Sequence, residues 1–549
     1  MEDRPKTDLR QQPEQRAQAS PCGVGCKSGA DVRGWITTIA QRRNLGLSDP
    51  EAYARAWRMI VDVNPFPATM GRVCPHPCES GCNRIGKDEA VSVNQMERFL
   101  GDWALRADMS LERLETDEKP ESIGVIGSGP AGLSFAYQMA RRGYAVTLYE
   151  RNPKAGGMLR YGIPVYRLPE AVLDAEIQRI LDLGVELKLD TRIGRDISVE
   201  QLESLHSIVF LGIGAQSGRV LGIPGEPGPG SWTGTEYLRR VNQGERVALG
   251  RRVAVIGGGN TAVDAARAAR RGGAEISLFY RRTRAEMPAI AGEIDEAIEE
   301  GIQLRYLVAP TEIIRNGETL ESLVLTKMKL GAADASGRRR PLPVAGSEYR
   351  VGVDSVIAAV SQESDWSGLE PYHFDADASP VERSGKTAEH VWAGGDVLGL
   401  GVAGTAIGTG RRASEAVHAR LRGLLEPALD PPDPIAVGPA KLDHYAERPR
   451  AAPQALPASA RLQQPDAEIH LGLSEEQFLE EASRCLSCGQ CFGCEQCWMY
   501  CSHNCFTRLE DVKPGMYYAV ALEACQACGK CIDICPCDFL QIRSLEAPA

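Results

Sequence analysis

The residues of this sequence with the clearest chemical potential are its cysteines. The chain of 549 residues has 17 cysteines, five between residues 22 and 82 and twelve between residues 485 and 537. Residues 83–484 contain none. Structural disulfides are typical of secreted proteins, whereas clustered cysteines in a reduced cytosolic chain are typical of metal ligands. The distribution therefore predicts metal centres near both ends of the chain.

The C-terminal cysteines form two runs of identical spacing. Each run has the form C-x2-C-x2-C-x3-C, and the second ends in Cys535-Pro536. This is the bacterial two-cluster pattern, in which the fourth cysteine of each run binds the other cluster, and soft thiolates in this spacing favour [4Fe–4S] clusters over zinc. The predicted ligand sets are Cys491, Cys494, Cys497 and Cys535 for one cluster, and Cys525, Cys528, Cys531 and Cys501 for the other.

A glycine-rich segment near residue 127 has the pattern of a dinucleotide-binding turn. The apolar residues 123–126 lead into Gly127-Ser128-Gly129-Pro130-Ala131, and Gly132 follows at the start of a predicted helix. Such a turn lets the backbone and the helix N-terminus approach a pyrophosphate. Glu150 lies 18 residues past Gly132, at the end of the next apolar strand. A carboxylate at this position can accept hydrogen bonds from ribose hydroxyls.

A second unit of the same type begins at residue 253 and differs at its end. Its turn reads Gly257-Gly258-Gly259-Asn260-Thr261, and Ala262 replaces the third glycine. Its second strand ends in Arg281-Arg282 in place of an acidic residue. Arginines can pair with the 2′-phosphate of NADPH, which a carboxylate would repel, so the site favours NADPH over NADH. The alternative is that both arginines are merely solvated.

Two nucleotide folds with unlike endings predict two cofactors, FAD in the first and NAD(P)H in the second. A short strand ending in Gly395-Asp396 fits, because this aspartate can hold the ribityl hydroxyls of a flavin. Thr405 and Ala406 then open a small-residue helix beside the flavin ring. A flavin-dependent disulfide reductase needs a redox cysteine pair near its flavin, so the absence of cysteine between residues 83 and 484 excludes that class.

Apolar spacing and composition predict the elements around these motifs. Periodic apolar residues predict helices over 31–42, 50–61 and 92–107. Residues 1–20 are polar and are predicted to be a flexible tail. Nine prolines between residues 427 and 465 predict an extended linker.

Composition also excludes several classes of protein. The net charge is −11 and no run of Lys or Arg exceeds three residues, so nucleic acid is not an expected partner. No apolar stretch is long enough to span a membrane, and the polar N-terminal segment is not a secretory signal. We therefore expect a cytoplasmic protein.

In this order and spacing, the motifs resemble those of the glutamate synthase small-subunit family of iron–sulfur flavoproteins. The segments that carry the resemblance are GRVCPHPCESGC (71–82), GSGPAGL (127–133), GGMLRYGIPVYRLP (156–169), LGIPGE (221–226), GGGNTAVDAAR (257–267), YRRTRAEMPA (280–289), AGGDV (393–397) and AIGTGRRA (406–413). With its ferredoxin-like C-terminus, the chain also resembles the NAD(P)H-oxidising iron–sulfur flavoproteins of the dissimilatory sulfite reductase system. It departs from the family at Ala359-Val360-Ser361-Gln362, where an Ile-Gly-Gln type sequence is usual.

The resemblance implies an α/β fold with a helical N-terminal iron–sulfur domain, two Rossmann-like domains and a C-terminal α+β ferredoxin domain of the bacterial type. It implies that the FAD domain is split around the NAD(P)H domain. The expected ranges are 1–20 (tail), 21–118 (iron–sulfur), 119–240 and 351–425 (FAD), 241–350 (NAD(P)H), 426–469 (linker) and 470–549 (ferredoxin). Further cofactor contacts are implied at Arg151, Gly157, Met158, Leu159, Arg167 and Gly214.

The resemblance also bears on the N-terminal cysteines, which are too few for two clusters. The family's early CxxC pair is missing, but a similar segment appears as Cys485-Leu486-Ser487-Cys488. We expect the chain to hold four [4Fe–4S] clusters. The implied N-terminal sets are Cys26, Cys74, Cys78 and Cys82 for one cluster, and Cys22, Cys485, Cys488 and Glu97 for the other, with Gln95 as a second candidate for Glu97. The alternatives are that Cys485 and Cys488 bind nothing, or that the N-terminal domain holds one cluster only.

The expected activity is electron transfer from NAD(P)H through FAD and the clusters to an acceptor. No pocket for a small organic acceptor is evident, so we expect a protein redox partner, with a sirohaem-containing sulfite reductase as a candidate, in a complex or as a homodimer. One alternative is the electron-input subunit of a glutamate-synthase-like amidotransferase, which the ferredoxin segment disfavours. The other is a non-catalytic iron–sulfur scaffold, which two complete glycine turns disfavour. The sequence is also compatible with the reverse direction, reduction of NAD(P)+.

Overall fold

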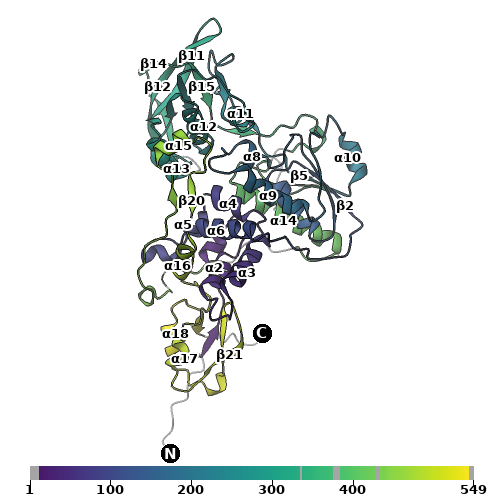
Figure 1. Ribbon diagram of the computed structural model, residues 1–549, viewed down its shortest axis with the longest axis vertical. Coiled ribbons are helices and arrows are strands. Elements are labelled where there is room, and N and C mark those ends of the chain that lie inside the picture. Colours follow the sequence, from purple (N-terminus) through teal and green to yellow (C-terminus); the bar gives the residue numbers. More distant parts are fainter. Residues whose placement is uncertain are drawn as a thin grey trace, which may run out of the picture. The chain divides into compact units, whose positions relative to one another are not determined.

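The computed structural model describes residues 12–333, 337–374, 382, 384–426, 433–436, 438 and 440–542. The chain, drawn in Figure 1, forms two compact units. Unit 1 comprises Met1–Leu111, Glu426–Pro453 and Gly472–Ala549, and unit 2 comprises Glu112–Leu425 and Gln454–Leu471. Residues 1–11 of the expected tail and 427–432, 437 and 439 of the expected linker lie outside the described residues. No helix in the described part is long and apolar enough to cross a membrane.

The first glycine turn lies in a six-stranded sheet of unit 2, with strand order β17-β18-β5-β2-β3-β4. These strands are β2 (Ser122–Ile126), β3 (Ala145–Tyr149), β4 (Glu186–Lys188), β5 (Ile208–Leu211), β17 (Lys386–Ala388) and β18 (Val391–Ala393). All neighbours pair in parallel except β17, which is antiparallel to β18. The central strand β5 is fully buried, as is typical of parallel sheets. The sheet thus combines strands from two parts of the chain that are far apart in sequence.

Five helices accompany this sheet. They are α7 (Pro130–Ala140), α8 (Met158–Tyr161), α9 (Glu170–Leu181), α10 (Val199–Leu205) and α14 (Ala403–Arg422). Helices α7 and α14 contact each other, and the Ser134 hydroxyl donates to the Ile407 carbonyl at 2.9 Å. Between them and β5, the rings of Phe135 and Phe210 stack at 4.2 Å. Short elements complete the region: β6 (Ser217–Gly218), which pairs with β16 (Gln362–Glu363), and the 3-10 turn η4 (Glu370–Tyr372).

The second glycine turn lies in a five-stranded parallel sheet with strand order β10-β9-β8-β15-β7. Its elements are β7 (Ser231–Thr233), α11 (Gly234–Asn242), β8 (Arg252–Ile256), α12 (Asn260–Arg271), β9 (Glu275–Tyr280), η3 (Arg284–Glu286), α13 (Ala291–Glu299), β10 (Gln303–Tyr306) and β15 (Ser355–Ala358). Strands β7 and β15 fall in ranges expected to belong to the FAD domain, but they pair here. Neither strand carries a glycine turn, so no local motif could assign it to a sheet.

An antiparallel sheet that the sequence did not predict follows β10. It contains β11 (Val308–Asn316), β12 (Thr319–Ala333), β13 (Arg339–Pro343) and β14 (Tyr349–Gly352), with β12 pairing to the other three. Its buried Ile313, Leu323 and Leu325 pack in one core with Ala254 and Ile256 of β8. This packing attaches the antiparallel sheet to the nucleotide-binding sheet.

Unit 1 is built on helices from both ends of the chain. Helices α2, α3 and α6 confirm the predictions over 31–42, 50–61 and 92–107, and α16 from the C-terminal region packs into the same core. Phe478 of α16 stacks on Phe99 of α6 at 4.1 Å. The helices and turns of unit 1 are α1 (Pro21–Gly25), α2 (Val32–Ala40), α3 (Asp49–Val61), α4 (Pro67–Val73), α5 (Pro77–Ser80), η2 (Asn83–Gly86), α6 (Val93–Arg106), η5 (Leu442–His444), α16 (Glu475–Ser483), α17 (Gln496–Met499), η6 (Leu522–Ala524) and α18 (Lys530–Ile534).

The C-terminal module of unit 1 includes part of the expected tail. Strands β21 (Phe506–Lys513) and β22 (Met516–Val520) form an antiparallel hairpin, and β23 (Leu540–Ile542) pairs with β1 (Pro13–Gln15). The prediction of a flexible tail is wrong for residues 12–20. Its polar side chains have a structural use: the amides of Gln12, Gln15 and Gln18 donate to carbonyls of Leu522, Tyr518 and Asp538.

The described part of the expected linker is packed rather than extended. In unit 1, the backbone N–H of Arg448 donates to Asp88, and the side chain of Arg450 pairs with Glu79. In unit 2, a segment with β19 (Gln454–Ala455), α15 (Ala458–Gln463) and the start of β20 (His470–Gly472) lies against α13. Residues 454–470, which we call the strap, are therefore held against α13 and do not form a free spacer.

Candidate functional site

The first glycine turn is shaped for close approach of backbone. A Cβ atom at Gly132 would lie 1.9 Å from the Gly127 carbonyl oxygen, so only glycine lets α7 pack on the turn. Gly157 has a φ of +53°, and a Cβ there would lie 2.6 Å from the Cα of Gly129. Because of this contact, the turn 127–131 lies against the start of α8, where Met158 and Leu159 follow Gly157.

Glu150 lies directly after β3 and is 2% exposed. Its Oε2 accepts a hydrogen bond from the Ser128 backbone N–H at 3.0 Å, and its Oε1 accepts from the Asn152 backbone N–H at 2.9 Å. The structure therefore brings the expected carboxylate to the glycine turn, as the sequence predicts for this strand end.

A small cavity beside Glu150 includes residues that the sequence did not single out. Asp365 binds Arg151 at 2.9 Å and Arg192 at 3.0 Å. Burial would raise the pKa of Asp365, but hydrogen bonds from Ser367 and the two arginines lower it below its ordinary value. The lining residues include the expected Gly127, Glu150 and Arg151, and also Thr191, Arg192, Gln216 and Asp365. These additions come from separate loops, so no motif could have found them.

The later flavin-site candidates lie at the end of β18 and the start of α14. The Gly395 backbone N–H donates to the Thr409 hydroxyl at 2.8 Å. Asp396 accepts from the Gly401 N–H at 3.1 Å, and burial raises the pKa of its carboxyl group. Thr405 and Ala406 lie in the first turn of α14, the helix that contacts α7. Gly214 lies in the loop after β5, with a φ of +64°.

Arg167 departs from its expected place at the flavin site. Its guanidinium group is buried and pairs with Asp264 of α12 at 2.7 Å and with Glu293 of α13. Burying an arginine requires such partners, since an unpaired charge would be strongly destabilising. Arg167 therefore joins its loop to the helices of the second sheet.

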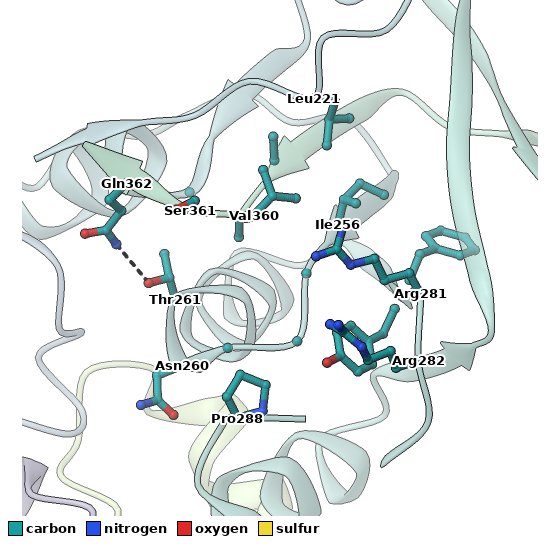
Figure 2. A pocket seen from close by; sticks show the side chains of 18 of the residues that line it. Leu221, Ile256, Asn260, Thr261, Arg281, Arg282, Pro288, Val360, Ser361 and Gln362 are labelled. Atoms are coloured by element: carbon teal, nitrogen blue, oxygen red, sulfur yellow. Dashed lines mark hydrogen bonds between the residues drawn. The ribbon is translucent and has the colours of Figure 1, made fainter. Parts of the chain in front are cut away.

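The second glycine turn opens into a cavity of about 790 Å³ (Figure 2). This is within the range typical of ligand-binding pockets. Gln362 donates through Nε2 to the Thr261 hydroxyl at 3.2 Å, so the segment that departs from the family lies in the wall of this cavity. The lining includes Gly257, Gly258, Gly259, Asn260, Thr261, Arg281 and Arg282 as expected, and also Leu221, Pro288, Arg338, Val360, Ser361, Gln362, Asp396, Leu400 and Gly401.

The two predicted arginines differ in their surroundings. Both line the cavity, and Figure 2 shows them at the end of β9 on the same side of the glycine turn. Arg281 is exposed, whereas Arg282 is 6% exposed and donates through Nε to the Arg339 carbonyl at 2.8 Å. Arg281 therefore presents the more accessible cation.

The C-terminal cysteines gather in the two predicted sets. Cys491, Cys494, Cys497 and Cys535 line one small cavity. In the other set, burial raises the pKa of Cys531 to about 12, and the nearby Cys525, Cys528 and Cys501 add to this effect. Thiols with raised pKa values stay protonated at neutral pH unless a metal replaces the proton. Cys505 and Cys537 belong to neither predicted set and are buried beside Cys501 and Cys535 respectively.

The remaining cysteines also form two sets, but the division differs from the expected one. Burial raises the pKa of Cys488 to about 12, and the neighbouring Cys22 and Cys82 add to this effect. The same two residues lie near Cys485. Burial likewise raises the pKa of Cys74 to about 12, with Glu97 and Cys26 as neighbours. The sets are Cys22, Cys82, Cys485 and Cys488, and Cys26, Cys74, Cys78 and Glu97.

The exchange of Cys82 and Glu97 has a local cause. Helix α5 ends at Ser80 and the chain turns at Gly81, so Cys78 and Cys82 point to different sets although they are four residues apart. Cys22 and Cys26 are separated in the same way by the end of α1. Glu97 accepts from the Asn64 side-chain amide at 2.8 Å, which orients its carboxylate. Gln95 instead donates to Asn94.

Arginines of the N-terminal segment hold the Cys485–Cys488 pair in place. Arg33 donates to the Cys488 carbonyl at 2.6 Å, and Arg84 donates to the Arg484 carbonyl at 2.7 Å. Arg484 is itself buried and pairs with Glu481 at 2.6 Å. Among the described residues, no three His, Cys, Asp or Glu side chains are close enough together to bind a single metal ion. This is compatible with the cysteine sets, because the ligands of a four-iron cluster lie further apart than those of one ion.

Comparison with known proteins identifies the fold of unit 2. Residues 121–420, more than half of the chain, match the family described as pyridine nucleotide-disulphide oxidoreductase. The chain belongs to this family. Residues 15–109 match a second family, dihydropyrimidine dehydrogenase domain II with a 4Fe–4S cluster. Pyridine nucleotide-disulphide oxidoreductases combine two dinucleotide-binding folds, which agrees with the two glycine turns.

Relatives of the chain extend this assignment to iron–sulfur flavoproteins. The beta subunit of the NADP(+)-dependent formate dehydrogenase of Moorella thermoacetica is 34% identical over 85% of this chain and 70% of its own length. The NADPH glutamate synthase small chain of Escherichia coli is 31% identical over 68% of this chain and 84% of its own length. The chain is therefore an NAD(P)H-dependent oxidoreductase, and its resemblance to the glutamate synthase small subunit is confirmed.

A solved structure supports the fold of the same region. Mycobacterium tuberculosis FprA, determined in complex with NADPH, covers 56% of this chain and 85% of its own, with a TM-score of 0.50 and 19% identity. The family name includes disulfide chemistry, but residues 83–484 of this member contain no cysteine. The region that matches the family therefore offers no cysteine pair for a redox disulfide.

Proposed function

We propose that the chain oxidises NADPH at the second glycine turn, through FAD bound at the first, and passes the electrons to [4Fe–4S] clusters and then to a protein acceptor. The observation that carries this proposal is the extent of the larger cavity. It is lined at one end by Arg281 and Arg282 and also by Asp396 and Gly401, which follow β18 of the first sheet. A nicotinamide in this cavity would therefore lie beside the flavin site.

In this proposal each expected residue has a defined task. The N–H groups of the glycine turn and the start of α12 bind the pyrophosphate of NADPH, and the helix dipole favours that negative charge. Asp396 holds the ribityl chain of FAD, and Glu150 holds its ribose. Bound FAD supplies the conversion of a two-electron hydride into single electrons, which clusters can carry.

Anaerobic titration with NADPH tests this assignment. NADPH is expected to bleach the visible absorbance band of the flavin. The variant Thr261→Trp places a large ring in the cavity and is expected to abolish bleaching by NADPH, while flavin content and reduction by dithionite stay unchanged. Bleaching of the variant at the wild-type rate would contradict the proposed nucleotide site.

We infer four clusters, with the N-terminal ligands divided as in the structure. One cluster takes Cys22, Cys82, Cys485 and Cys488, and the other takes Cys26, Cys74, Cys78 and the Glu97 carboxylate. The proximity of Cys26 and Glu97 to Cys74, and of Cys22 and Cys82 to Cys488, supports this division. Four clusters correspond to about sixteen iron atoms per chain. Anaerobic iron and sulfide assays near eight would contradict the inference.

The acceptor is proposed to be a protein that docks on unit 1. The C-terminal cysteine sets support this, because such a pair of clusters carries single electrons to a protein and does not serve a small substrate. A sirohaem sulfite reductase is our candidate acceptor, and a glutamate-synthase-like amidotransferase is the second. Copurification from cells with one or the other distinguishes them, since each has its own visible spectrum.

A further inference from the structure

A third arginine borders the nucleotide cavity, from a part of the chain far from the nucleotide motif. Arg338 lies just before β13, in the antiparallel sheet that follows β10, and lines the cavity together with Arg281 and Arg282. It is the first of three consecutive arginines, Arg338-Arg339-Arg340. Arg340 does not line the cavity.

The neighbouring residue attaches this segment to the end of β9. Arg339 pairs with Glu286 at 2.6 Å, and its carbonyl accepts the Nε–H of Arg282 at 2.8 Å. Glu286 in turn accepts from the Thr283 backbone N–H at 3.0 Å. These contacts join segment 282–286 to residue 339. Arg338 is therefore held at the cavity wall beside the two predicted arginines.

The charges around the cavity indicate what Arg338 binds. Among the lining residues of the described chain, three are arginines and one, Asp396, is a carboxylate that lies near the flavin site. In a Rossmann fold the end of the second strand is where the adenosine ribose lies. A phosphate monoester there carries nearly two negative charges and three acceptor oxygens, enough for several guanidinium groups.

We propose that Arg338 is a third ligand of the NADPH 2′-phosphate and helps this chain to select NADPH over NADH. The inference rests on the proposed nucleotide site. It assigns part of the nucleotide specificity to the antiparallel sheet, so the two predicted arginines are not the whole phosphate site. Arg281 and Arg282 follow the end of β9, and Arg338 contributes to the phosphate site from the segment just before β13.

The test compares Arg338→Gln with the matched control Arg340→Gln in the full-length, flavin-loaded chain. Calorimetry measures the binding of 2′,5′-ADP and of 5′-AMP, which differ only in the 2′-phosphate, and steady-state kinetics measures KM for NADPH and NADH. Arg338→Gln is expected to weaken 2′,5′-ADP and raise KM for NADPH by about tenfold, with changes below about twofold for 5′-AMP and NADH. Arg340→Gln is expected to change none of them.

The outcomes separate this inference from the proposed function. If Arg338→Gln weakens the binding of 2′,5′-ADP and of 5′-AMP equally, or weakens neither, the proposed role of Arg338 is overturned while the nucleotide site stands. If NADPH fails to bleach the flavin of the wild-type chain, the proposed function is overturned. The binding of 2′,5′-ADP still reports on Arg338 in that case, because it needs no electron transfer.

Discussion

The two units of this chain build their sites in opposite ways. In unit 2, each nucleotide-binding turn and the charged residues that follow it lie within about thirty consecutive residues, and the strand–turn–helix fold brings them together. In unit 1, Cys485 and Cys488 join cysteines more than four hundred positions earlier in the sequence. A local motif shapes its own site, whereas a site assembled from distant segments also stabilises the fold that assembles it. The predictions below test this contrast.

The largest effect is expected from removing the distant cysteine pair. Cys485→Ala combined with Cys488→Ala should cost about four iron atoms per chain and destabilise the helices of unit 1, because metal binding contributes directly to folding. Iron assays and thermal unfolding followed by circular dichroism measure both effects. Cys525→Ala with Cys528→Ala is the matched control. It should also cost about four iron atoms but leave α2, α3 and α6 as stable as in the wild type.

Unchanged iron content in the first variant would mean that the distant pair binds no cluster. In that case any cluster of the N-terminal segment would draw its cysteines from residues 22–82 alone.

A smaller effect is expected at the non-cysteine position. Glu97→Ala leaves three cysteines in its set, so we expect loss of about one iron atom per chain and a changed electron paramagnetic resonance signal. Gln95→Ala, on the same helix, is the control and should alter neither. Loss of iron in Gln95→Ala but not in Glu97→Ala would assign the ligand to Gln95, whose side chain donates to Asn94 in the structure.

The local sites of unit 2 should respond without any change in iron. Arg281→Ala with Arg282→Ala should raise KM for NADPH roughly ten- to a hundredfold, since a charge-assisted contact contributes about 1.5–3 kcal/mol, and should hardly change KM for NADH. Arg284→Ala removes a nearby exposed arginine that pairs with Asp295 and does not line the cavity, so it serves as the control. Equal effects on both nucleotides would show that these arginines do not read the 2′-phosphate.

One of the distant contacts of unit 2 is expected to have the smallest effect. His470 of the strap binds Glu296 of α13 at 2.8 Å. Burial would raise the pKa of Glu296, but His470, Arg267 and Arg461 outweigh it and lower the pKa to about 2. Because the folded-state pKa is below the unfolded value near 4.5, this carboxylate stabilises the fold above pH 4.5 and loses its contribution as the pH falls towards 2.

Chemical denaturation at several pH values measures that contribution. Glu296→Gln should show a weaker loss of stability between pH 4.5 and 2 than the wild type. An identical pH dependence in both proteins would show that the strap contact is not linked to this carboxylate.

What the sequence predicts well here is local. The glycine turns, Glu150 and the helices of unit 1 follow from spacing within a single element or loop. Both C-terminal cysteine sets follow from a motif of two short cysteine runs. The antiparallel sheet β11–β14 carries no such motif and was missed. Arg167 was assigned from a resemblance, but its partners Asp264 and Glu293 lie on helices about a hundred residues later. The exchange of Cys82 and Glu97 depends on where a four-residue helix ends, which spacing alone does not determine.

The pairing of β1 with β23 has a consequence for how the protein is made. Pro13–Gln15 are synthesised more than five hundred residues before their partners Leu540–Ile542. Until those partners are synthesised, this strand has no edge to pair with, and Cys22 lacks its neighbours Cys485 and Cys488. The sheets of unit 2 lie between these segments in the sequence, so unit 2 can fold while the rest of the chain is still being synthesised. The pairing of β1 and the completion of the set Cys22, Cys82, Cys485 and Cys488 can therefore follow only after the C-terminal segment has been synthesised.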